Sequence, residues 1–145
     1  MKVRVLRFGA AKQLGSSILA HIGEGSHLLG LDLQVVPRSV YVGQGQLVHD
    51  VIKQMAPNWV INVAAMTNVD GAHESPELAI KVNGLGPAHI SRSSSEVGAR
   101  TVHISSEAVF DREAQSRYEE DDDCNPVSVY GTSKLAGEAL TRTYT

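Results

Sequence analysis

Strand-like and helix-like segments alternate along the whole chain, and this alternation constrains the fold more than any other feature. Four β-branched or apolar runs have the length of strands, at residues 3–8, 27–33, 59–65 and 100–105. Four segments carry apolar side chains at helical spacing, at residues 13–22, 43–56, 77–97 and 127–144. The pattern predicts a single α/β domain over residues 1–145 with a doubly wound parallel sheet of the Rossmann type.

The segment 77–97 carries a second signal, because Gly84, Gly86 and Pro87 interrupt its helical pattern. Proline removes a backbone donor and clashes with the preceding turn, so we expect this helix to be kinked or split. Five consecutive acidic residues, 119–123, lie between the last two helical segments. We expect a solvated loop there rather than a divalent-cation site, since nothing nearby fixes a coordination geometry.

Charge and composition exclude several classes of function. The 145 residues carry a net charge of -3, which provides no basic footprint for nucleic acid or an anionic membrane. No apolar run approaches the roughly 20 residues that cross a bilayer. Cys124 is the single cysteine, and the six histidines form no pair at metal-ligand spacing, so we expect no disulfide and no metal site. A cytoplasmic protein is the expectation.

The first strand runs into a glycine-containing turn that opens a helix. Gly9 and Gly15 bracket this turn, and Asp32 follows at the end of the second strand. A turn of this kind holds a dinucleotide pyrophosphate against helix N–H groups, and a carboxylate placed like Asp32 accepts hydrogen bonds from the adenine ribose. A plain strand-to-helix turn also uses two glycines, so this alternative remains open.

The last helical segment carries Tyr130 and Lys134, four residues apart and therefore on one helix face. An ammonium beside a phenol favours the phenolate, which makes the phenol a usable proton donor to a carbonyl that receives a hydride. Ser106 comes just after the fourth strand, where ligands sit in open α/β sheets. The alternatives are an ordinary helix surface for the first two residues and a turn-capping serine for the third.

Beyond these local signals, a series of stretches matches one known family in order and at near-gapless spacing. They are Phe8-Gly9 with Gln13-Leu14-Gly15, residues 60–70, 74–77, 82–83, 96–99, 103–105 and 109–111, and Pro126 with residues 129–138. On these motifs the chain resembles the N-terminal half of an extended short-chain dehydrogenase/reductase, and most resembles the dTDP-4-dehydrorhamnose reductase family. The family's substrate domain, which follows this half, is absent from the chain.

The resemblance implies NADP- or NAD-dependent reduction of a nucleotide sugar, a dTDP-4-keto sugar, in dTDP-rhamnose biosynthesis. It makes Tyr130 the proton donor, gives Lys134 the nicotinamide ribose, and places Ser106 and Glu107 at the substrate. The same resemblance allows a homodimer through the two long helical segments. The cofactor-binding residues that it implies, besides Lys134, are Gly9, Lys12, Gln13, Leu14, Gly15, Asp32, Ala65, Met66 and Thr67.

Three positions depart from the family pattern. Lys12 stands where the family has the middle glycine of its pyrophosphate turn, and a Cβ there hinders close approach of the backbone. Tyr41 replaces an acidic residue near the adenine, and Ala108 replaces an aromatic residue. These departures favour an alternative, a non-catalytic nucleotide-binding or regulatory subunit of the same fold; a remnant without any ligand is the third possibility.

Overall fold

The computed structural model describes residues 3–145 apart from 10–12, 22–25, 32–41 and 115. Its four strands are all parallel and form one sheet in the order β2-β1-β3-β4. Their bounds are Val3–Phe8 for β1, Ser26–Leu31 for β2, Trp59–Asn62 for β3 and Arg100–His103 for β4. Because all four strands point the same way, their carboxyl ends lie at one edge of the sheet.

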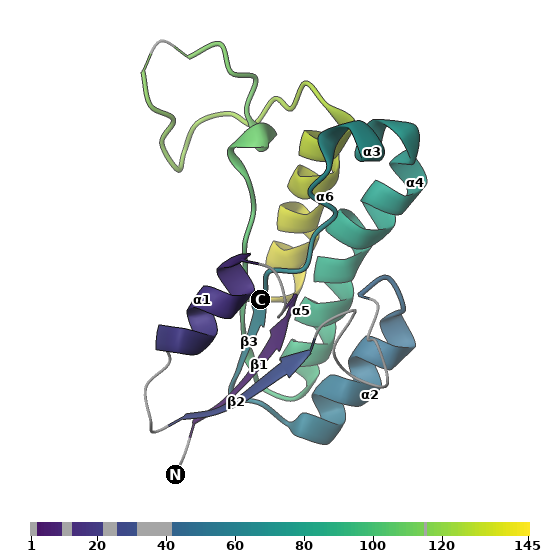
Figure 1. Cartoon of the computed structure of the whole chain (residues 1–145), viewed down its shortest axis with the longest axis vertical. Coiled ribbons are helices and arrows are strands. Elements are labelled where there is room, and N and C mark those ends of the chain that lie inside the picture. The colour runs from purple at the N-terminus through teal and green to yellow at the C-terminus, as the bar shows by residue number, and fades with distance from the viewer. Residues whose placement is uncertain (1–2, 10–12, 22–25, 32–41, 115) are drawn as a thin grey trace.

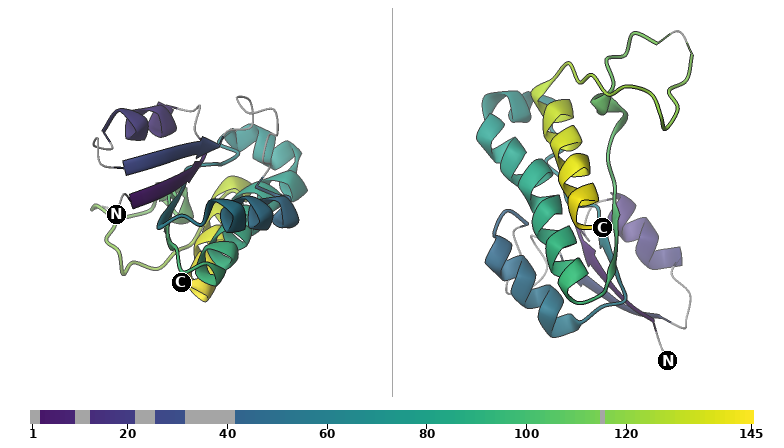
Figure 2. Two further views of the ribbon diagram at one scale, coloured as in Figure 1. Left: turned by 90° about the horizontal axis from the view of Figure 1, so that it is seen from below. Right: turned by 180° about the vertical axis from the view of Figure 1, so that it is seen from behind.

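Helices cover both faces of this sheet (Figures 1 and 2). Helix α1 (Gln13–His21) lies on one face by itself. The other face carries α2 (Gly45–Met55), α5 (Gly86–Glu96) and α6 (Val129–Tyr144). This arrangement confirms the predicted α/β class with a doubly wound parallel sheet.

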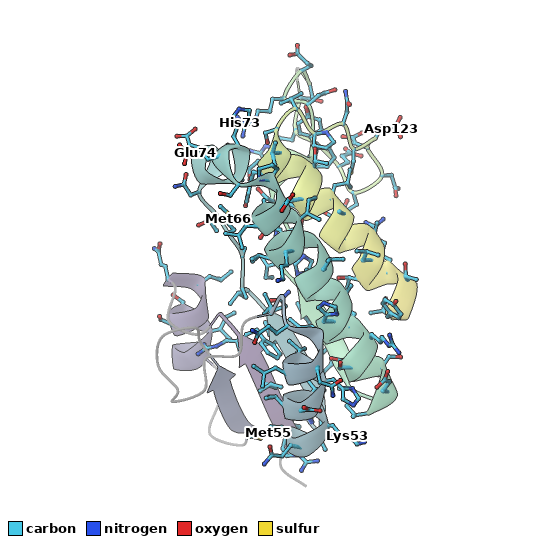
Figure 3. All side chains as sticks on the ribbon, turned by 90° about the vertical axis from the view of Figure 1, so that its right-hand side faces the viewer. Lys53, Met55, Met66, His73, Glu74 and Asp123 are labelled. Atoms are coloured by element: carbon cyan, nitrogen blue, oxygen red, sulfur yellow. The ribbon has the colours of Figure 1, made fainter. Side chains whose placement is uncertain are left out.

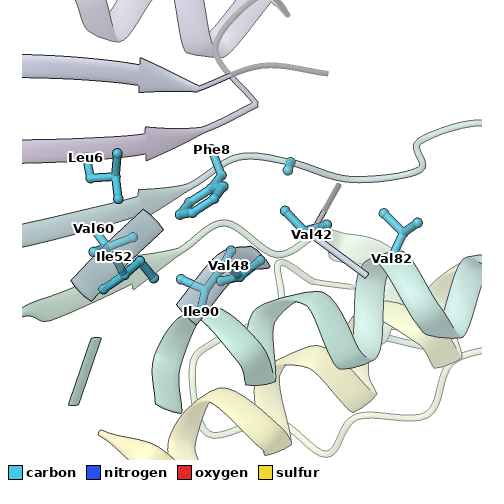
Figure 4. Packing of buried hydrophobic residues seen from close by; sticks show 9 residues of the cluster. Leu6, Phe8, Val42, Val48, Ile52, Val60, Val82 and Ile90 are labelled. Carbon is cyan, nitrogen blue, oxygen red and sulfur yellow. The ribbon is translucent and has the colours of Figure 1, made fainter. Parts of the chain in front are cut away.

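The hydrophobic core lies between the sheet and the helices α2 and α5 (Figure 4). Side chains alternate across a strand, so Leu6 and Phe8 of β1 point into this core while Arg7 points toward α1. Burial of each large aliphatic or aromatic side chain stabilises the fold by about 1.5–3 kcal/mol. The buried members are Leu6, Phe8, Val42, Val48, Ile52, Val60, Ala64, Val82 and Ile90.

The helical segment around residues 76–96 is continuous but changes its hydrogen-bond spacing. It consists of α4 (Pro76–Ala79), a π-helical segment η1 (Ile80–Leu85) and α5. The N–H of Gly86 bonds the carbonyl of Lys81, five residues earlier. Pro87 has no N–H for the carbonyl of Asn83, so the α-helical ladder cannot continue unchanged through this point. The sequence predicts a kink or a split at this point; the structure shows no split but a π-helical segment within a continuous helical run.

Three local features after the ends of β3 and β4 differ from the sequence prediction. Strand β3 ends at Asn62, three residues early, because the Asn62 side-chain oxygen accepts the N–H of Ala64 and turns the chain away from strand pairing. A short helix, α3 (Val69–Glu74), follows it and was not predicted. Asn68 caps this helix by accepting the N–H of Gly71 at 3.1 Å. A 3-10 turn, η2 (Glu107–Val109), likewise follows β4.

The surface agrees with the expected loop at the acidic run. Residues 119–123 are exposed in the long segment that precedes α6, and Figure 3 shows Asp123 on this segment. In the described part of the chain, no three His, Cys, Asp or Glu side chains are grouped as metal ligands. Nor does any described helix have both the length and the apolar character needed to cross a membrane.

Candidate functional site

The segments that follow the carboxyl ends of β1, β3 and β4 carry most of the predicted site residues. Gly9 follows β1, residues 65–67 follow β3, and Ser106 follows β4. The first two turns of α6 bring Tyr130 and Lys134 to the same end of the molecule. Lys12 and Asp32, and the departure at Tyr41, lie outside the described residues.

Gly9 is the point at which the turn after β1 touches the segment after β3. Its φ of +84° lies in the left-handed region that favours glycine. A Cβ at this position would lie 2.6 Å from the backbone nitrogen of Ala64 and 2.7 Å from the carbonyl carbon of Val63. Only glycine fits here, because the segment after β3 packs directly against the Gly9 backbone.

Helix α1 begins just beyond this turn. Gln13 and Leu14 are exposed at its start, while Gly15 is buried. The fully buried Arg7 donates a hydrogen bond from Nη1 to the carbonyl oxygen of Gly15, which ties β1 to the first turn of α1. The exposed start of a helix at the carboxyl end of β1 presents N–H groups to an anion.

Asn83 connects the segment after β3 with α6. Its Oδ1 accepts the N–H of Met66 at 2.8 Å, and its Nδ2 donates to the carbonyl of Met66 and to Ser133 Oγ, each at 3.0 Å. Asn83 is fully buried in η1, and Figure 3 shows Met66 on the segment alongside this helical run. One side chain therefore fixes the predicted cofactor-lining segment relative to the helix that carries Tyr130.

Lys134 is buried, with 2% of its surface exposed. Its Nζ donates to the carbonyl oxygen of Ile104, just after β4, at 2.7 Å. Burial lowers the pKa of Lys134 to about 8, and the carboxylate of Glu138 opposes this by raising it. At pH 7 about nine in ten Lys134 side chains carry the charge. Tyr130 is partly buried one helical turn earlier on the same face of α6.

A neutral histidine lies beside this lysine. Burial, followed by the charge of Lys134, lowers the pKa of His103 to about 4, against a hydrogen bond with the Asn62 backbone that raises it. Asn62 Nδ2 lies 3.1 Å from His103 Nδ1, and Asn62 Oδ1 accepts the N–H of Ala64. The low pKa leaves the imidazole of His103 neutral at pH 7.

Ser106 and Glu107 form the turn that faces the start of α6. Ser106 Oγ accepts the N–H of Ala108 at 3.2 Å and donates to Glu107 Oε2 at 3.1 Å. Ser106 therefore caps this turn, which is the alternative role that the sequence analysis gives for it. Gly131 packs against this turn, since a Cβ there would lie 2.1 Å from the carbonyl oxygen of Ala108. This close contact places Tyr130 next to the turn that holds Ser106.

The site contains buried and partly buried polar residues to which the sequence analysis assigns no role. They share one signal, a polar side chain at a core-facing position of an otherwise apolar strand or helix. Such a position demands a hydrogen-bond partner without indicating which one. These residues are Arg7, Asn62, Asn83, His103 and Glu138.

The arrangement combines a glycine turn at a helix start with a hydroxyl, a phenol and a buried ammonium at the ends of neighbouring strands. Such a set of groups matches the dinucleotide site and the phenolic proton donor that the sequence predicts.

Comparison with known proteins agrees with these features. The family model described as the RmlD substrate binding domain matches residues 2–145. The chain is 38% identical over 140 residues to a dTDP-4-dehydrorhamnose reductase of Mycobacterium tuberculosis, covering 93% of this chain and 44% of that protein. It is 30% identical over 139 residues to the spore coat polysaccharide biosynthesis protein SpsK of Bacillus subtilis, covering 96% and 48%.

Solved structures of dTDP-4-dehydrorhamnose reductases also resemble this chain. A dTDP-4-dehydrorhamnose reductase from Clostridium acetobutylicum superposes with a TM-score of 0.93 at 35% identity, over 99% of this chain and 50% of that one. The reductase from Bacillus anthracis in complex with NADP gives 0.92 at 30% identity, over 99% and 50%. The chain spans about half the length of the curated relatives it matches.

Proposed function

Since the chain belongs to the family described as the RmlD substrate binding domain, we propose that it forms the dinucleotide-binding and catalytic half of an NADP- or NAD-dependent reductase. The substrate is a dTDP-4-keto sugar, reduced at its carbonyl in dTDP-rhamnose biosynthesis. The observation that carries this proposal is the buried Lys134 ammonium, held on the Ile104 carbonyl one turn from Tyr130.

The chain's own residues divide the work. The turn at Gly9 and the start of α1, including Gln13, Leu14 and Gly15, bind the pyrophosphate, and residues 65–67 line the cofactor after β3. The dinucleotide, when bound, supplies the hydride. Lys134 holds the nicotinamide ribose and stabilises the tyrosinate that forms when Tyr130 gives its proton to the substrate oxygen.

Ser106 and Glu107 orient the substrate carbonyl in this proposal. The Ser106 hydroxyl accepts the Ala108 N–H in the turn beside the start of α6, because Gly131 lets the helix approach this turn. For Ser106 to donate to the substrate, its hydrogen bond to Glu107 must be exchanged for one to the carbonyl oxygen.

Turnover by the chain with reduced dinucleotide and the dTDP-4-keto sugar, followed by loss of nicotinamide absorbance, tests the proposal. We expect Tyr130→Phe to lower the rate by about 100-fold or more while cofactor binding persists, because only the proton donor is lost. Tyr118→Phe, on the loop before α6, is the matched control and keeps the rate. Unchanged turnover by Tyr130→Phe contradicts the assignment. Dinucleotide binding without any turnover favours the non-catalytic or regulatory alternative.

We also propose a homodimer through the helical run of α4, η1 and α5 together with α6. Leu78, Ile80 and Leu85 support this interface, because each is 37–44% exposed on that run. Sedimentation equilibrium tests it: Leu85→Glu should dissociate the dimer, whereas Lys53→Glu on the exposed surface of α2, outside the interface, should not. A monomer at every concentration contradicts it.

A further inference from the structure

Glu138 is a largely buried carboxylate that the proposed reaction does not use. It follows Tyr130 and Lys134 along α6 at four-residue spacing, so the three side chains share one face of the helix. Only 18% of its side chain is exposed. A buried carboxylate destabilises a fold unless it is hydrogen-bonded, so its partners indicate what it does.

The first partner is the segment after β4. Ser105 Oγ donates a hydrogen bond to Glu138 Oε1. The preceding residue, Ile104, accepts from Lys134 Nζ through its carbonyl at 2.7 Å. Two consecutive residues after β4 thus hold two consecutive turns of α6, and the next residue is Ser106. The contact between Ser105 and Glu138 therefore helps to fix the distance between the Ser106 turn and the Tyr130 face.

The second partner is the charge of Lys134. Burial disfavours the ammonium form of this lysine, and the carboxylate of Glu138 is the nearby charge that raises its pKa again. Arg142, one turn further, pairs with Glu138 at 3.5 Å, but its side chain is 80% exposed and solvent screens it. The carboxylate of Glu138 therefore favours the ammonium form of Lys134.

No other charged group described around this row takes that role. His103 faces Lys134 from β4 and is neutral at pH 7. Lys81 on η1 and Glu107 on η2 are exposed on elements that pack against α6. On α3 and α4 the ionisable side chains are exposed; they are Asp70, His73, Glu74 and Glu77. On α5 they line the hollow between α5 and α2; they are His89, Arg92 and Glu96.

We propose that Glu138 and Ser105 form a positioning pair that fixes the end of β4 on α6 and places a carboxylate on the helix face that carries Lys134. The proposal rests on the proposed function only where it concerns the cofactor. Two variants distinguish the effect of the Glu138 charge from the effect of its hydrogen bond with Ser105. Glu138→Gln removes the charge but keeps an oxygen that accepts from Ser105, whereas Ser105→Ala removes the hydrogen bond but keeps the charge.

The first readout is the titration of lysine side chains by NMR in the ligand-free chain, with Lys134→Met identifying the resonance. We expect Lys134 to titrate at about 8 in the parent chain. The value should fall by about one pH unit in Glu138→Gln, the low end of what an opposite charge within reach produces. Ser105→Ala and Arg142→Met, the exposed control, should change it little. An unchanged Lys134 titration in folded Glu138→Gln overturns the charge role.

The second readout is dinucleotide affinity at two pH values. If the ammonium form binds, Glu138→Gln should weaken binding about fivefold near pH 8 and hardly at all near pH 6, because protonation restores the charge. Ser105→Ala should weaken binding equally at both values, since it acts through position. Equal losses at both values in Glu138→Gln would mean a structural role alone. Absence of binding by the parent chain fails the proposed function, while the lysine titration still decides the charge role.

Discussion

The contact between α6 and η1 has no room for a single added methyl group at Gly137. A Cβ there would lie 2.2 Å from the carbonyl oxygen of Asn83 and 3.2 Å from Pro87 Cγ. Carbon and oxygen approach to about 3.3 Å without repulsion, so Gly137→Ala must move α6 away from η1 by about 1 Å. Both groups that clash are attached to backbone, so a rotamer change cannot relieve the overlap.

The magnitude follows from two opposing effects. Overpacking of this kind costs up to about 3 kcal/mol, while alanine favours the helix over glycine by about 1 kcal/mol. Gly137→Ala should therefore lower the free energy of unfolding by about 2 kcal/mol, which moves the urea midpoint by about 1 M. The shift also separates Asn83 from Ser133, so dinucleotide affinity should fall in the same variant.

Gly84→Ala is the matched control, because it makes the same chemical change on the facing helix. A Cβ at Gly84 would lie 3.6 Å from Ala136 Cβ, an ordinary contact. We expect this variant to be as stable as the parent chain or more stable by up to about 1 kcal/mol. Urea unfolding of both variants decides the matter. Equal midpoints for Gly84→Ala and Gly137→Ala would refute the close-contact reasoning.

Three further predictions concern the site. Asn83→Ala, which leaves the Met66 backbone without its partners, should cost about 3 kcal/mol in urea unfolding, against about 1 kcal/mol for the exposed cap variant Asn68→Ala; similar losses would contradict the clamp. Gly9→Ala should destabilise the chain by more than about 2 kcal/mol and abolish dinucleotide binding, because φ is +84° and the backbone after β3 is 2.6 Å from the new Cβ; retained binding in calorimetry would contradict this. The folded-state pKa of His103 is about 4 against 6.5 unfolded, so its contribution is complete above pH 6.5 and should fall by about 3 kcal/mol as the pH drops to 4. Thermal unfolding between pH 4 and 6.5 should show a weaker dependence of stability on pH in His103→Gln than in the parent chain. The same dependence in both chains would contradict the prediction.

The parts of the fold that follow local rules were predictable from the sequence. Strand β1 is predicted with its observed bounds, because residues 3–8 are a β-branched run that ends at a glycine. Pro87 and the neighbouring glycines predict an interruption of the α-helical hydrogen-bond pattern, because proline has no N–H to donate. The structure shows this interruption as the π-helical spacing of η1. The shared face of Tyr130 and Lys134 follows from helix periodicity alone.

The parts that depend on contacts between distant residues were not predictable. Asn83 meets Met66 17 residues away and Ser133 50 residues away, and no periodic pattern encodes such a pair. Ser105 and Glu138 are 33 residues apart and belong to different elements. Helix α3 was missed because it has six residues with Gly71 among them, so neither length nor apolar spacing marks it.

The most direct test of the proposed function is a calorimetric titration of the chain with NADPH and with NADH, beside Lys134→Met. Lys53→Met on α2 is the control, because Lys53 is an exposed lysine away from the strand ends. We expect binding by the parent chain and by Lys53→Met, and binding weaker by about tenfold or more in Lys134→Met, as the loss of a charge-assisted hydrogen bond predicts. Equal affinities in all three chains, or no binding by the folded parent chain to either dinucleotide, would contradict the proposed site.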